Sequence, residues 1–169
     1  MVVPSEIADS ILKPHFDAVR DVFVEYRTHT GETLKLLAKT RFVVVEGVHD
    51  GGRHFAGCRE DGLLLYLAPE SVELPVETLV AILAHEFGHA ADFAYPARWL
   101  PERDEPARWL EEGRRGTTKW RKAWGQRNED QVEWAADSIA YAVTGKRVGY
   151  CGPCLLQCFD GKPRPEGLK

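Results

Sequence analysis

The strongest constraint on the fold is a pair of histidines inside an otherwise apolar helical segment. From Pro75 to about Ala94 the sequence reads PVETLVAILAHEFGHAADFA, with apolar residues at helical spacing. His85 and His89 are four residues apart, so they point the same way from adjacent turns of this predicted helix. They are either hydrogen-bonded core histidines or ligands of one metal ion, and the spacing favours metal ligands.

The residue that follows the first histidine adds a possible catalytic group. Glu86 directly follows His85 and lies on the neighbouring face, which completes the pattern H-E-x-x-H. Zinc lowers the pKa of a bound water to near neutral, and a nearby carboxylate can then take its proton. Glu86 is therefore predicted to be a catalytic general base rather than a ligand.

A second long helix is predicted from Asn128 to Gly145, reading NEDQVEWAADSIAYAVTG. Its Glu133 is the favoured third zinc ligand, because a catalytic zinc takes three protein ligands and keeps one open position. Asp137, one turn later, is the expected hydrogen-bond partner of a ligand histidine. Small residues near this face, Ala136 and Ala140, would let the two helices approach closely.

Other assignments remain open at this stage. Glu129 and Asp92 are alternative third ligands, and Asp137 is otherwise a surface charge. An oxyanion in peptide hydrolysis is stabilised by the metal and a donor side chain. The sequence does not choose among three tyrosines for that donor: Tyr95, Tyr141 and Tyr150.

The remaining pattern predicts an α+β fold. A first helix is expected from Ser5 to Tyr26, although Pro14 interrupts it. The segment from Arg41 to Pro69 contains β-branched and apolar runs around an Asp-Gly pair, a strong hairpin signal. It is expected to form a small antiparallel sheet packed on the histidine helix and the glutamate helix. Residues 1–145 would form one domain, followed by a cysteine-containing tail at 146–169.

HEFGH followed by Glu133, Ala136, Asp137, Ile139 and Ala140 on a later helix resembles the gluzincin-type zinc metallopeptidases. The closer likeness is to minimal zincin domains of phage and bacterial metallopeptidases related to the ImmA/IrrE group, and it covers about residues 41–145. The resemblance implies a zincin-like fold with an edge strand beside the zinc that pairs with the substrate backbone. The matching strand would be Gly62 to Glu70. The insert at 98–127, rich in Trp and Arg, and the cysteine tail depart from the family pattern.

Four cysteines are candidates for a second metal site. Cys58 falls on a predicted strand, and the tail sequence YCGPCLLQC supplies the others, Cys151, Cys154 and Cys158. Together they could hold a second, structural zinc ion. The alternatives are a disulfide or redox pair and four unligated thiols.

Composition and charge limit the classes of partner that this chain is expected to bind. The net charge of −4 gives no global attraction to nucleic acid or membranes, and no apolar run approaches a membrane span. The N-terminus lacks the pattern of a secretory signal, so a cytoplasmic protein is expected. Residues 113–127 are basic with two tryptophans and could bind nucleic acid, but we favour a structural role for them. No feature indicates an oligomeric state.

The sequence thus predicts a zinc metallopeptidase acting on a peptide or protein substrate. His85, His89 and Glu133 would bind Zn²⁺, and Glu86 would be catalytic. Two alternatives are a regulatory zincin that cleaves one dedicated partner and a non-catalytic zinc or nucleic-acid-binding module.

Overall fold

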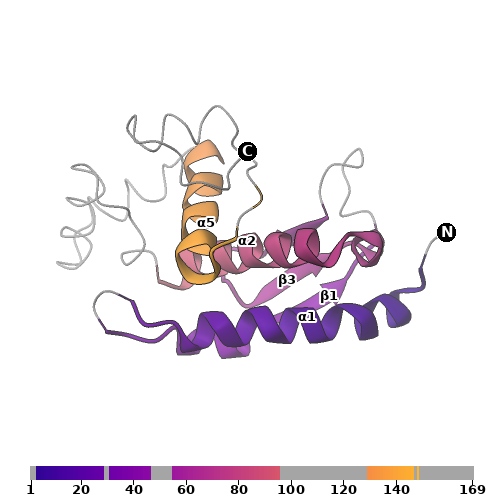
Figure 1. Cartoon of the computed structure of the whole chain (residues 1–169), viewed down its shortest axis with the longest axis horizontal. Coiled ribbons are helices and arrows are strands. Elements are labelled where there is room, and N and C mark those ends of the chain that lie inside the picture. The colour runs from indigo at the N-terminus through magenta and orange to yellow at the C-terminus, as the bar shows by residue number, and fades with distance from the viewer. Residues whose placement is uncertain (1–2, 29–30, 47–54, 96–128, 147, 149–169) are drawn as a thin grey trace.

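The computed structural model describes residues 3–28, 31–46, 55–95, 129–146 and 148. Within α5, the side chains of residues 129–131 and 134 are also outside the description. The insert at 98–127, Tyr150 and the three tail cysteines lie outside the described residues, as does the side chain of Glu129. The described part has an α+β architecture, as expected, with helices on one side of a small sheet (Figure 1).

The first helix, α1 (Ser5–Glu25), confirms the sequence prediction despite Pro14 in its interior. Its buried residues recur every three or four positions and form one stripe toward the core: Ala8, Leu12, Phe16, Val19 and Phe23. Pro14 lies away from this stripe on an exposed surface. A short 3-10 helix, η1 (Lys35–Lys39), follows and packs on α1.

Within the described ranges the sheet has three strands: β1 (Arg41–Val44), β2 (Ala56–Cys58) and β3 (Leu64–Leu67). The expected hairpin is present, since β2 pairs antiparallel with β3, and Gly62 closes the turn at a φ of 71°. The expected all-antiparallel sheet is wrong, because β1 pairs with β3 in parallel.

The strand order β1-β3-β2 places β3 in the centre, so the expectation that Gly62 to Glu70 forms an edge strand is also wrong. The physical reason lies in burial. Leu65 and Leu67 are fully buried, whereas the residues of β2 are only half-buried. A near-continuous apolar run is typical of a strand with neighbours on both sides. The edge strand that contacts α2 is β2.

After β3, the 3-10 helix η2 (Pro69–Glu73) leads into α2 (Val76–Ala94), which lies over the sheet and alongside α1. The last described helix, α5 (Glu129–Thr144), packs at one end of α2 and rises away from α1 (Figure 1). Both helices occur where the sequence predicts them, and α5 is followed by Gly145 at a φ of 70°, which is typical of a helix end.

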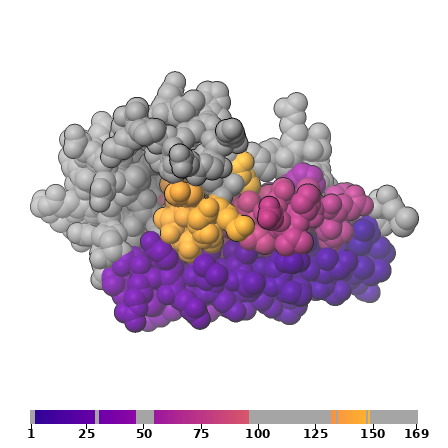
Figure 2. Space-filling model, viewed as in Figure 1, coloured from indigo at the N-terminus to yellow at the C-terminus, as the bar shows by residue number. Residues whose placement is uncertain are grey.

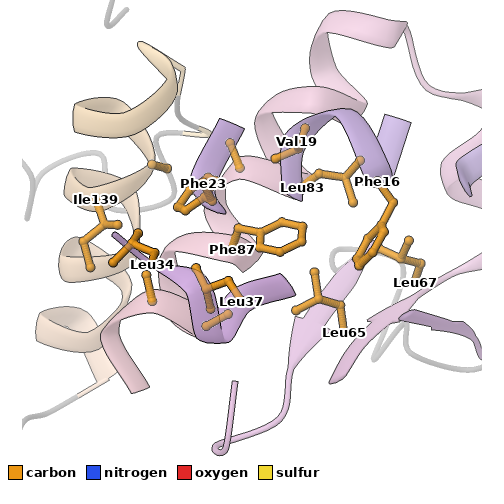
Figure 3. Packing of buried hydrophobic residues seen from close by; sticks show 14 of the residues in the cluster. Phe16, Val19, Phe23, Leu34, Leu37, Leu65, Leu67, Leu83, Phe87 and Ile139 are labelled. Atoms are coloured by element: carbon orange, nitrogen blue, oxygen red, sulfur yellow. The ribbon is translucent and has the colours of Figure 1, made fainter. Parts of the chain in front are cut away.

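The core forms where these elements meet. Phe87 of α2 lies at its centre, surrounded by residues of α1, η1, β3 and α5 (Figure 3). Its ring centroid is 5.1 Å from that of Phe16 and 5.4 Å from that of Phe23. In the space-filling view, α1 forms the lower surface, with α2 and α5 side by side above it (Figure 2). Because Phe87 is anchored on one face of α2, the histidines on either side of it in sequence are fixed in orientation.

None of the helices among the described residues combines the length and apolar character needed to cross a membrane.

Candidate metal centre

The two histidines of α2 form one face of a buried site. His85 is 1% exposed and His89 is 7% exposed. Their ring centroids are 4.7 Å apart and the rings are nearly perpendicular. The helical spacing thus brings the two imidazoles together without a distortion of α2.

The second face of the site comes from α5, which approaches α2 at Gly88. A Cβ atom on Gly88 would lie 2.8 Å from the carbonyl carbon of Ala136 and 3.0 Å from its Cα. No side chain fits between the two backbones at that point. Ala135, Ala136 and Ala140 are buried as well, which confirms that small residues allow the close approach. The approach brings Glu133 and Asp137 within reach of the histidines.

Glu133 bridges the two imidazoles. Its Oε2 lies 2.9 Å from Nε2 of His85, and its Oε1 lies 3.3 Å from Nε2 of His89. The ligand atoms of all three residues lie within 4.8 Å of one another. Three nitrogen and oxygen atoms that converge in this way could hold a metal ion.

Asp137 holds His85 from the opposite side. Its Oδ1 lies 2.6 Å from Nδ1 of His85, and the Asp137 side chain is 1% exposed. When Nδ1 carries the proton and donates it to this carboxylate, Nε2 is left as a lone-pair donor that faces Glu133. The arrangement is the one that a metal-binding histidine requires.

His89 is oriented differently. Its ring stacks on Phe93 one turn later, with centroids 5.9 Å apart and planes 16° from parallel. Within the described part of the chain its Nδ1 has no hydrogen-bond partner. Stacking on Phe93 and the contact of Nε2 with Glu133 therefore orient His89, whereas His85 has a carboxylate partner at both ring nitrogens.

The hydrogen bonds within the site change the pKa values of its residues. Burial lowers the pKa of His85, but hydrogen bonds to Asp137 and Glu133 outweigh it and raise that pKa to about 10. Burial raises the pKa of Glu133, but its hydrogen bonds to the two histidines dominate and hold the pKa well below its usual range. Without a metal, the site therefore holds a proton on His85 between two carboxylates. A pocket that stabilises a positive charge in this way suits a cation.

Glu86 lies beside this group and outside it. It is 5% exposed and follows His85 on the next face of α2. The Glu86 carboxylate adds to burial in raising the pKa of the Cys58 thiol, so its field reaches β2. Glu86 is therefore a buried carboxylate next to the histidine face of α2, and its charge acts on Cys58 of the edge strand.

The alternative third ligand on α2 lies outside the group of converging ligand atoms. Asp92 is fully buried on α2 but is not part of the group whose ligand atoms converge.

The Tyr95 hydroxyl accepts a hydrogen bond from the Leu36 N–H of η1 at 2.9 Å, so it anchors the end of α2. Tyr141 lies on α5 two turns beyond Glu133. Cys58 is half-buried on β2, where its Sγ donates to the Arg59 carbonyl at 3.3 Å.

Comparisons with protein-family models, curated proteins and solved structures found no match to this chain.

Proposed function

We propose that this protein is a zinc-dependent metallopeptidase of the gluzincin type. The observation that carries the proposal is the convergence of His85 Nε2, His89 Nε2 and the Glu133 carboxylate, together with the bond from Asp137 to His85. The α+β arrangement of a sheet, a histidine helix and a glutamate helix agrees with the family that the sequence resembles. Zinc is the preferred ion because two imidazoles and one carboxylate form a known catalytic zinc set.

Each residue has a defined part in the proposed mechanism. His85, His89 and Glu133 would hold the ion, which would supply Lewis-acid activation of a water and of the scissile carbonyl. Asp137 keeps the His85 proton on Nδ1, so that Nε2 stays available. Glu86 would take a proton from the attacking water and pass it to the leaving amine nitrogen. Its burial keeps its carboxylate away from competing bulk water.

The proposed substrate is an extended peptide that pairs with β2. This strand is the sheet edge in contact with α2, and among the described residues only β3 pairs with it. Backbone pairing at an edge strand gives affinity with little demand on side-chain sequence. β2 replaces β3 as the proposed docking strand because β3 has neighbours on both sides.

The test replaces Glu86 with Gln in the full chain. Loss of a general base is expected to lower peptide cleavage by at least about 10²-fold while the metal content stays at that of the wild type. Glu77→Gln is the matched control, because Glu77 is an exposed residue in the first turn of the same helix. Cleavage is measured by mass spectrometry on a peptide library derived from a whole proteome.

Two results would contradict the proposal. Cleavage by Glu86→Gln at the wild-type rate would remove Glu86 from the mechanism. A wild-type protein that carries one zinc ion but cleaves neither the library nor folded proteins would favour the non-catalytic zinc module.

A further inference from the structure

The chain turns back on itself directly after α5. Gly145, in the left-handed region, donates its N–H to the Tyr141 carbonyl at 2.8 Å and closes the helix. The Thr144 hydroxyl donates to the Ala140 carbonyl at 2.6 Å and accepts the Lys146 N–H at 3.1 Å. Backbone and side-chain hydrogen bonds together therefore define the direction in which the chain leaves the helix.

This reversal brings a backbone amide to the metal site. The N–H of Val148 donates to Oδ1 of Asp137 at 3.4 Å, and Val148 is half-buried. The same oxygen lies 2.6 Å from Nδ1 of His85. A single carboxylate oxygen thus joins the chain that follows α5 to a histidine of the metal group.

The position of this oxygen matters because Asp137 is almost fully buried. A buried carboxylate that loses one of its donors regains part of its desolvation cost and can lower that cost by rotating. Rotation of Asp137 would change the direction of its hydrogen bond to His85. The His85 ring would then turn, and its Nε2 would point in a different direction. Hydrogen-bond partners of metal ligands commonly change metal affinity by 10- to 100-fold when they are removed.

We propose that the Val148 amide is a positioning group: it orients Asp137, and through it His85, so that the chain leaving α5 sets the metal affinity. The inference rests on the metal site of the proposed function and adds a means of regulating it. Any event that moves the Val148 amide away from Asp137 would weaken metal binding. Such an event would act on the metal without touching its ligands.

The first test compares Val148→Pro with Val148→Ala in the full chain. Proline removes the N–H donor, whereas alanine keeps it and shortens only the side chain. Zinc affinity is measured by competition with a chromophoric chelator. Val148→Pro is expected to bind zinc roughly 3- to 10-fold more weakly, since one hydrogen bond to a charged group is lost. Val148→Ala should stay within about twofold of the wild type.

A second pair keeps the test valid if proline disturbs folding. Thr144→Val removes the hydroxyl that holds the reversal, and Thr144→Ser keeps it. Zinc affinity should fall in the valine variant and return in the serine variant. Equal zinc affinity in Val148→Pro and Val148→Ala, in proteins that fold like the wild type, would overturn the inference.

A spectroscopic measurement separates this inference from the proposed function. In metal-free protein, the Nδ1–H proton of His85 reports its bond to Asp137 by NMR. Its resonance should shift in Val148→Pro and not in Val148→Ala. If the wild type binds no zinc but the resonance shifts, the proposed function fails and the positioning role remains. If the resonance is unchanged, the positioning role is overturned whether or not zinc binds.

Discussion

At the scale of single residues, His85 is the position where a proton and the proposed metal ion would compete. Its two ring nitrogens face two different carboxylates, Asp137 at 2.6 Å and Glu133 at 2.9 Å. In the metal-free protein these carboxylates hold a proton that a metal ion must displace from Nε2. If the proposed metal ion binds here, its affinity should therefore depend on pH through His85.

The sign of this dependence follows from the raised pKa of His85, about 10. Below that pH the metal-free protein holds the proton, and binding must release it, so metal affinity should rise with pH. Between pH 6 and 8.5 we expect about one proton released from His85 per metal bound, which is about a tenfold gain in affinity per pH unit. Titration calorimetry in buffers of different ionisation enthalpy counts these protons. An affinity independent of pH over this range would contradict the assignment.

The convergence of the candidate site residues was largely predictable from the sequence because helical spacing is a local rule. Residues four apart share a face whatever surrounds them, so His85 with His89, and Glu133 with Asp137, followed from the pattern alone. The bond from Val148 to Asp137 could not be predicted, since a backbone donor carries no side-chain signature. The role of Tyr95 was open for a related reason: its partner is the backbone N–H of Leu36, 59 positions away.

At the scale of elements, the contact between α2 and α5 depends on Gly88. A methyl group there would meet the backbone of Ala136, which cannot move aside as a flexible side chain could. Gly88→Ala should therefore separate the two helices and lower the free energy of unfolding by about 1–3 kcal/mol. This loss should appear even though alanine favours a helix over glycine by up to about 1 kcal/mol. Zinc affinity should fall as well, because Glu133 moves away from the histidines.

The matched control is Gly57→Ala on β2, where an added Cβ would meet only Cδ2 of Tyr66, at 4.0 Å. Chemical denaturation and zinc titration of both variants measure the two effects. If Gly88→Ala is as stable as the wild type and binds zinc equally well, the close approach of α2 and α5 is not required.

Strands were less predictable than helices. The Asp-Gly turn revealed the β2–β3 hairpin because its signal is local. The parallel pairing of β1 with β3 was missed, since an alternating apolar pattern in β1 (Phe42 and Val44 inward) fits either direction. Leu65 and Leu67, in the near-continuous apolar run of β3, were the available signal for a central strand.

At the scale of the whole molecule, the proposed zinc ion should stabilise the fold. A ligand that binds only the native state adds about 4 kcal/mol to the free energy of unfolding at 1,000 times its Kd. Scanning calorimetry should show this rise for wild-type protein when zinc is added, and no rise for Glu133→Ala. Glu73→Ala, at an exposed position, is the control. A wild-type transition that zinc does not move would contradict the metal site.

The same preparations show how many zinc ions a chain carries, by mass spectrometry. One ion removed by Glu133→Ala belongs to the histidine site. A second ion removed by Cys58→Ser would support the four-cysteine site, of which only Cys58 lies within the described residues.

The long sequence separation between α2 and α5 affects the order in which the protein unfolds. His85 and Glu133 are 48 positions apart in sequence. Bringing together the ends of a loop of that size costs about 4 kcal/mol in chain entropy. In the metal-free protein, packing around Gly88 and the hydrogen bonds from Glu133 and Asp137 to His85 must offset this cost, so α5 should detach before α1, the sheet and α2 separate. A bound ion would act as a removable cross-link, and its loss would divide one cooperative unit into two.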